Sequence, residues 1–251
     1  MQQVDLAIVG AGPAGIAASL EAASLGLSVV LLDEQPRAGG QIYRDVERAT
    51  MEKIEVLGSD YAAGRELITA LRSSKVRHVH GASVWQVDLE GVVNFLEAGK
   101  ANSLSASRVL IATGAIERPV PIPGWTTPGV MMAGAGQILL KQSGVVAKRA
   151  VIAGSGPLLY LLAAQMVRAG TPPLALVETQ TAKDVLRAQR HFFGALFGWR
   201  YVVKGQSLLS ELRRAGVRRY RAAAELQVRG QDVVERLHFT HRGRSREIAC
   251  D

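Results

Sequence analysis

Short apolar runs and helical patterns alternate at the start of the chain. Residues 4–9 are apolar apart from Asp5, which is typical of a strand buried on both faces of a parallel sheet. Residues 14–25 are rich in alanine and end at Gly26, which predicts a helix with a glycine stop. Residues 28–32 form a second apolar run, so the order predicts a right-handed β-α-β crossover.

The same pattern returns in the second half of the chain. An apolar run at residues 148–153 leads into Gly154 and Gly156, and a helical pattern then ends at Gly170. Another apolar run follows at residues 174–177. The two glycine motifs begin 144 residues apart, and this internal repeat predicts two copies of one βαβ unit.

Two stretches between the repeats fix the predicted domain boundary. Residues 107–112 resemble a further buried strand, and the prolines and glycine of residues 119–124 then break regular structure. We therefore predict an α/β fold with two Rossmann-like dinucleotide-binding domains, at residues 1–118 and 119–251.

Positive charge is concentrated in the last third of the chain. The net charge is +8, and residues 183–251 hold fifteen Lys or Arg against seven Asp or Glu. These arginines are scattered among helix and strand patterns without interleaved aromatic residues, which favours a solvent-exposed face over a nucleic-acid surface. A docking face for another protein chain is the second interpretation. The arginines concerned are Arg213, Arg214, Arg218, Arg219 and Arg221.

Cysteine and hydropathy patterns exclude other classes. The single cysteine, Cys250, excludes both a disulfide framework and a redox-active cysteine pair. The sequence contains no run of eighteen apolar residues, the length that would predict a membrane span. It also shows no secretory leader pattern, so we expect a cytoplasmic protein. The five histidines lack a third ligand at a workable spacing, and neither a metal site nor a catalytic residue can be named.

The aromatic segment at residues 191–199 contains three of the five phenylalanines. A cluster of this kind usually belongs to a hydrophobic core, and we expect that here. The alternative is a subunit contact, because the segment also carries two glycines.

The first glycine motif has the spacing of a phosphate-binding turn. Gly10 permits a tight turn, Gly12 allows the backbone to approach a pyrophosphate, and Gly15 allows close packing of helix on strand. Pro13 and Ala14 begin the helix, whose N-terminus favours anions.

An acidic residue stands where a ribose would be bound. Asp33 follows Gly10 by twenty-three residues at the end of the second predicted strand, and its neighbour Glu34 is an alternative. A glycine turn that binds nothing is the competing interpretation, but the strand, helix and acid together favour a dinucleotide site.

The second glycine motif is altered. Leu159 occupies the third position, where glycine or alanine is expected, and should push the helix away from the strand. Glu178 follows Gly154 by twenty-four residues and has the position of a ribose ligand. A site for an adenine nucleotide (NAD or ATP) and a retained fold without a site both stay open.

Three segments carry a family resemblance: residues 33–44 (DEQPRAGGQIYR), residues 111–115 (IATGA) and residues 123–137. They resemble the opine oxidase and hydrogen cyanide synthase group within the FAD-dependent, pyridine-nucleotide-disulfide-oxidoreductase-like superfamily. This group includes the alpha subunits of heteromeric sarcosine oxidases and of dye-linked proline and hydroxyproline dehydrogenases.

The resemblance implies FAD in the first domain. The predicted cofactor-binding residues are Gly10, Gly12, Pro13, Ala14, Gly15, Asp33, Glu34, Gly40, Gln41, Ala112, Thr113 and Gly114, with Gly154, Gly156 and Glu178 in the second domain. Relatives return to complete the FAD domain with a Gly-Asp pair, and this sequence contains no Gly-Asp dipeptide. We therefore expect the C-terminal part of the FAD domain to be absent and FAD binding by this chain alone to be weak.

The resemblance implies an FAD-binding subunit of a heteromeric amino-acid, imino-acid or opine dehydrogenase or oxidase. It implies that the partner is a smaller flavoprotein subunit, and it allows for an iron–sulfur subunit. An NAD(P)H-dependent FAD reductase is the first alternative, disfavoured by Leu159 and the missing cysteine pair. A non-catalytic nucleotide-binding scaffold is the second.

Overall fold

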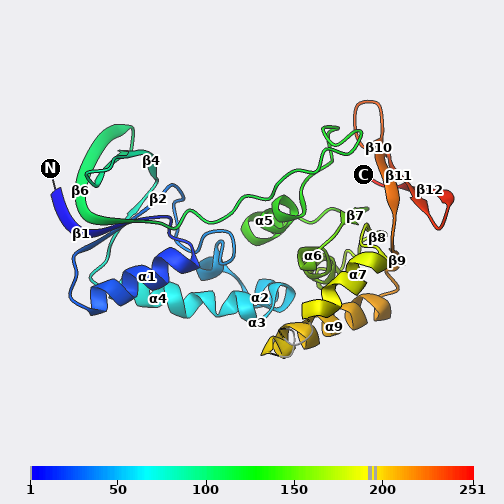
Figure 1. Cartoon of the computed structure of the whole chain (residues 1–251), viewed down its shortest axis with the longest axis horizontal. Coiled ribbons are helices and arrows are strands. Elements are labelled where there is room, and N and C mark those ends of the chain that lie inside the picture. The colour runs from blue at the N-terminus through cyan, green and yellow to red at the C-terminus, as the bar shows by residue number, and fades with distance from the viewer. Residues whose placement is uncertain (1, 192–193, 195–196) are drawn as a thin grey trace. The chain divides into compact units, whose positions relative to one another are not determined.

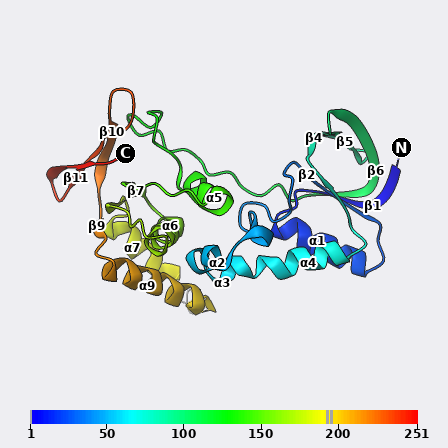
Figure 2. The same cartoon turned by 180° about the vertical axis from the view of Figure 1, so that it is seen from behind.

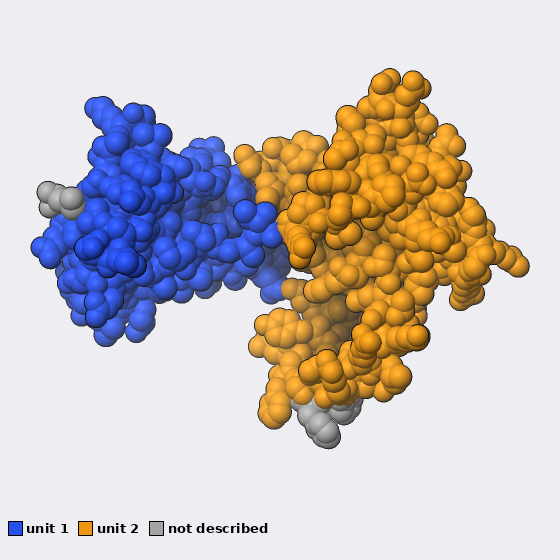
Figure 3. Space-filling model, turned by 45° about the horizontal axis from the view of Figure 1, so that its top comes forward, with its two compact units in different colours: residues 1–116 blue, residues 117–251 orange. Residues whose placement is uncertain are grey.

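The chain folds into two compact units, residues 1–116 and 117–251, coloured separately in Figure 3. The computed structural model describes residues 2–191, 194 and 197–251. The boundary between the units lies two residues before the one that the sequence predicts, at Ile116.

Unit 1 is built on a six-stranded sheet with the order β3-β2-β1-β6-β5-β4. The strands are β1 (Gln2–Val9), β2 (Val29–Asp33), β3 (Arg77–His80), β4 (Ala82–Val87), β5 (Val92–Glu97) and β6 (Lys100–Ile111). Strands β1, β2, β3 and the C-terminal half of β6 run parallel, and β4 and β5 form an antiparallel extension. The predicted first βαβ unit is confirmed.

The helices of unit 1 connect these strands. They are α1 (Pro13–Ser24), the 3-10 turn η1 (Val46–Arg48), α2 (Met51–Leu57), α3 (Ser59–Ala62) and α4 (Gly64–Ser73). Helices α1 and α4 lie side by side against the sheet in both views (Figures 1 and 2). Ala7, Val30 and Leu32 of the parallel strands are fully buried. They belong to one core cluster with Val93 and Phe95 of β5.

The predicted burial of residues 107–112 is wrong. Strand β6 pairs with β1 as far as Ile111, but β5 pairs with it only up to Ser105. One edge of the C-terminal half of β6 therefore has no neighbouring strand among the described residues. Leu110 and Ile111 are exposed by 39% and 59% as a result.

Unit 2 contains the second βαβ repeat as a three-stranded parallel sheet with the order β7-β8-β9. Its elements are α5 (Ala133–Ser143), β7 (Val151–Gly154), α6 (Pro157–Arg168), β8 (Ala175–Glu178), α7 (Ala182–Ala188), η2 (Gln189–His191), α9 (Trp199–Arg214) and β9 (Arg218–Tyr220). The prediction of an α/β fold with two Rossmann-like units is confirmed.

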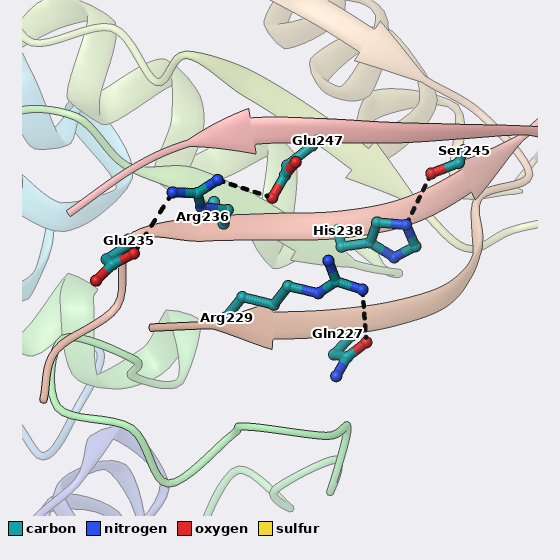
Figure 4. Close-up of polar contacts among 7 residues, drawn as sticks. All are labelled: Gln227, Arg229, Glu235, Arg236, His238, Ser245 and Glu247. Atoms are coloured by element: carbon teal, nitrogen blue, oxygen red, sulfur yellow. Dashed lines mark hydrogen bonds and ion pairs between the residues drawn. The ribbon is translucent and has the colours of Figure 1, made fainter. Parts of the chain in front are cut away.

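An antiparallel sheet of β10 (Ala224–Arg229), β11 (Arg236–His241) and β12 (Arg244–Ala249) completes unit 2. Leu237 and Phe239 of β11 are buried. Its other face is polar: Arg236 lies between two glutamates, Glu235 and Glu247, at 3.5 and 3.4 Å, and His238 lies 2.8 Å from the Ser245 hydroxyl (Figure 4). Arg236 thus has two nearby carboxylates, whereas Arg229 contacts the Gln227 side-chain oxygen at 3.5 Å.

The described aromatic residues of the segment 191–199 do not lie in the core that the sequence predicts for the segment. Phe197 is 93% exposed and Trp199 is 60% exposed. Helix α9 buries only Leu208 and Leu212, so its first turns project beyond the residues against which it packs. Residues 192–193 and 195–196, on which the rest of that prediction falls, lie outside the described residues.

The tight packing of α1 on β1 gives a stability prediction. A Cβ atom on Gly15 would lie 1.9 Å from the Gly10 carbonyl oxygen, so the backbone must move to accommodate it. We expect Gly15→Ala to lower the free energy of unfolding by about 1–3 kcal/mol, measured by thermal or urea denaturation. Gly205→Ala in α9 is the matched control, because no heavy atom lies within 4 Å of its added methyl. An unchanged melting temperature for Gly15→Ala would contradict the packing described here.

Candidate functional site

The glycine turn of unit 1 lies at the carboxyl end of β1. Gly10 has a φ of +107°, and a Cβ atom there would lie 2.4 Å from the Ala112 carbonyl oxygen and 3.1 Å from the Thr113 Cα. The Ala112 amide donates to the Val9 carbonyl at 2.8 Å, which holds the end of β6 beside the turn. The structure therefore brings the predicted residues at the ends of β1 and β6 together, and only glycine fits between them.

Three further predicted residues follow the turn or the end of β6 in the sequence. Pro13 occupies the first helical position of α1, where its missing N–H is not needed. Ala14 is exposed on the same first turn. Gly114 has a φ of +78°, and no heavy atom lies within 4 Å of its Cβ position, so the space beside this residue is open.

The loop after β2 is pressed against the glycine turn. A Cβ atom on Gly40 would lie 2.8 Å from the Gly12 Cα, and the Gly39 amide donates to the Ala11 carbonyl at 2.8 Å. No side chain caps the N-terminus of α1 after Gly12. Its first amides therefore stay available to an anion that approaches between two glycines without side chains.

Asp33 joins the end of β2 to the turn. One carboxylate oxygen accepts from the Ala11 amide at 2.5 Å and the other from the Gln35 amide at 2.7 Å. Each oxygen keeps a further lone pair for a ribose hydroxyl. Its neighbour Glu34 is exposed and accepts from the Gln35 side chain at 3.2 Å, so the acid that touches the turn is Asp33.

Side-chain contacts hold the rest of this loop. Arg44 donates to the Gln35 amide oxygen at 2.6 Å, and Arg37 pairs with Asp45, whose side chain is 8% exposed. Gln41 is exposed and donates to the Ala115 carbonyl at 3.1 Å. The loop that follows Asp33 is therefore fixed at both of its ends.

The glycine turn of unit 2 differs from that of unit 1 in the side chains packed against it. Gly154 has a positive φ of +133°, as Gly10 does, but Gly156 has a φ of +103° where Gly12 has −77°. Leu159 is 5% exposed, and its Cδ1 lies 3.6 Å from the Cβ position of Gly154. The third motif position, which has no room for a Cβ atom at Gly15 of unit 1, thus carries a buried apolar side chain in unit 2.

Glu178 lies at the end of β8 with its side chain 5% exposed. Arg219 of β9 donates from Nε to Oε1 at 2.6 Å and from Nη2 to Oε2 at 3.0 Å, and the Tyr160 hydroxyl of α6 donates to Oε2 at 3.0 Å. Hydrogen bonding to Glu178 raises the pKa of Arg219, and burial followed by the Glu178 charge raises the pKa of Tyr160. These three side chains form one buried polar group, named here the Glu178 triad.

Sequence reasoning missed Arg219 and Tyr160. The sequence pattern predicts a solvent-exposed face for Arg219, which is correct for its exposed neighbours Arg218 and Arg221 but wrong for Arg219, whose side chain is 17% exposed. The signal that could have found it is its place in a short strand beside the one that ends in an acid.

Metal-binding side chains do not gather near these turns in the part of the chain that the structure describes. The described residues contain no group of three or more His, Cys, Asp or Glu able to hold a metal ion. A cavity of about 940 Å³ in unit 2, beside Gly154, is lined mostly by apolar side chains of α5, β7 and β10. No helix among the described residues is long and apolar enough to cross a membrane.

Comparisons with known proteins agree with this architecture. Residues 4–195 match the family model described as pyridine nucleotide-disulphide oxidoreductase. An opine oxidase subunit of Rhizobium meliloti (strain 1021) is 42% identical over 95% of this chain and 53% of its own length. Hydrogen cyanide synthase subunit HcnB of Pseudomonas aeruginosa is 41% identical over 65% of this chain and 36% of its own.

A solved structure shows the same fold at lower identity. L-proline dehydrogenase from P. horikoshii superposes with a TM-score of 0.66 and 20% identity, over 99% of this chain and 40% of that one. The chain spans about half the length of the opine oxidase subunit that it matches. The resemblance inferred from the signature segments is confirmed, and the chain belongs to the pyridine nucleotide-disulphide oxidoreductase family.

Proposed function

We propose that unit 1 holds FAD and that the chain is an FAD-binding oxidoreductase subunit of a heteromeric enzyme. That enzyme would oxidise the C–N bond of an amino acid, imino acid or opine. The observation that carries the proposal is the meeting of the glycine turn, Asp33 and the loop at Gly39 and Gly40 at one edge of the sheet.

The residues at this edge fit the parts of a flavin dinucleotide. Amides at the start of α1, beside Gly12, would bind the pyrophosphate, and Asp33 would accept from the adenosine ribose. Gly40 and Gln41 would lie against the flavin half, where backbone without a Cβ permits close approach. A bound flavin supplies the redox chemistry, and the protein contributes binding, orientation and electrostatics.

Three observations support a partner chain. The opine oxidase relative and HcnB are both named as subunits. The cavity of unit 2 is lined mostly by apolar side chains, with few charged ones, among them Glu117 and Glu225. The start of α9 exposes Phe197 and Trp199, which are typical of a subunit contact. We propose a smaller flavoprotein chain as this partner, in a cytoplasmic enzyme that can include an iron–sulfur subunit.

The proposed site predicts the identity of the cofactor and its dependence on one carboxylate. The cofactor bound should be FAD and not FMN, because only the adenine half of a dinucleotide offers a ribose diol to Asp33. Asp33→Asn should weaken FAD binding about tenfold or more, measured by flavin fluorescence titration, because charge-assisted hydrogen bonds are lost. Glu34→Gln, at the exposed neighbouring acid, should leave the affinity within about twofold. Equal losses in both variants would argue against Asp33 as the ribose ligand.

The absence of a nameable acid–base set predicts dependence on a partner. The chain alone, reconstituted with FAD, should not oxidise proline, hydroxyproline, sarcosine, glycine or opines in a dye-linked assay. A flavin without a positioned donor has no productive geometry for hydride transfer. Activity should appear on co-expression with the smaller flavoprotein chain. Clear turnover of any of these substrates by the isolated chain would refute the proposal.

A further inference from the structure

We propose that Arg219 determines nucleotide selectivity in unit 2. By holding Glu178 in an internal ion pair, Arg219 prevents this carboxylate from binding the ribose hydroxyls of a nicotinamide dinucleotide such as NADH. This inference concerns unit 2 only and does not depend on whether unit 1 holds FAD.

The two units supply a comparison within one chain. Asp33 and Glu178 are each the last residue of the second strand of a βαβ repeat, at nearly equal spacing from Gly10 and Gly154. An acid at this place accepts from a ribose diol when its carboxylate faces the glycine turn. The equivalent positions therefore allow the direction of each carboxylate to be compared.

The two carboxylates make contacts of different kinds. Asp33 accepts from the Ala11 amide of the glycine turn itself. Glu178 accepts from side chains of β9 and α6, through both of its oxygens. In the backbone of unit 2, Gly154 pairs with Glu178 in the β7–β8 ladder, and the Thr179 amide donates to the Gly154 carbonyl at 2.9 Å.

Burial makes the ion pair difficult to open. The side chains of Glu178 and Arg219 are 5% and 17% exposed, and the Arg219 guanidinium also lies over the Tyr160 ring, 5.5 Å from its centre. Turning Glu178 toward a ribose would leave a partly buried guanidinium without its carboxylate, which is unfavourable. Hydrogen bonds from two ribose hydroxyls to the carboxylate do not restore the negative charge that the guanidinium loses beside it.

The triad does not convert into a site for a 2′-phosphate. Two of the guanidinium donors, Nε and Nη2, are already committed to Glu178. A phosphate placed against Arg219 would also lie beside the Glu178 carboxylate, and like charges at that distance repel. The Glu178 triad therefore lowers the affinity of unit 2 for both NADH and NADPH.

The test is a nucleotide titration of the full chain. Wild type should bind NADH with a dissociation constant of about 1 mM or weaker, followed by nicotinamide fluorescence or calorimetry. Arg219→Met keeps much of the aliphatic volume but removes the guanidinium, and should tighten NADH binding about tenfold or more. The same gain in an Asp33→Asn background would assign it to unit 2. A folded Arg219→Met variant that gains no affinity would overturn the proposal.

A second variant keeps the test decisive where Arg219→Met does not fold. Glu178→Gln retains an acceptor for Arg219, and should leave NADH binding unchanged, because the carboxylate takes no part in it. Micromolar NADH binding by wild type that weakens about tenfold in Glu178→Gln would show that Glu178 holds the ribose, and would overturn the proposal. NADPH binding that is tighter than NADH binding and is lost in Arg219→Met would identify Arg219 as a phosphate ligand, with the same consequence.

Discussion

The contact between the Asp33 carboxylate and the Ala11 amide is the interaction on which unit 1 depends. It ties the end of β2 to the turn that follows β1, and the Gly39 amide reaches the carbonyl of the same Ala11. One residue of the turn therefore receives both the strand-end acid and the loop that follows it. Hydrogen bonds to an ionised carboxylate are stronger than neutral ones, so Asp33 holds the turn firmly in front of the uncapped N-terminus of α1.

Unit 2 shows what the same backbone pattern becomes without that contact. Its turn still carries two glycines, but Gly156 has a positive φ where Gly12 does not, and Leu159 packs beside Gly154. Glu178 is satisfied by Arg219 and Tyr160, so the strand end is stabilised by side chains in place of a ligand or turn amide. The two repeats share a fold and differ in the partner of one carboxylate.

The sequence was sufficient for those parts of the structure that local sterics decide. Gly15 could be placed because the carbonyl that leaves it no room for a Cβ atom belongs to Gly10, five residues earlier. Gly10 and Gly12 could be placed because their spacing is that of a phosphate-binding turn. Asp33 could be placed because the length of a βαβ crossover is nearly fixed, which brings the end of the second strand beside the turn.

Contacts between distant residues could not be predicted in the same way. Arg219 lies forty-one residues after Glu178, and no local pattern distinguishes it from Arg218, which faces solvent. The exposure of Phe197 and of Ile111 also depends on which elements are present to cover them, and aromatic or apolar composition alone predicts burial for both. Sequence composition thus identified the apolar segments without indicating what they pack against.

The central claim is that one dinucleotide site, in unit 1, is built for a ribose diol and the other is not. Equilibrium dialysis of the full chain against FAD, with the bound flavin counted per chain, tests it most directly. We expect saturation at one FAD per chain, a loss of that binding in Asp33→Asn and no change in Glu178→Gln. Two FAD per chain, or a single FAD whose binding is lost in Glu178→Gln and kept in Asp33→Asn, would contradict the account.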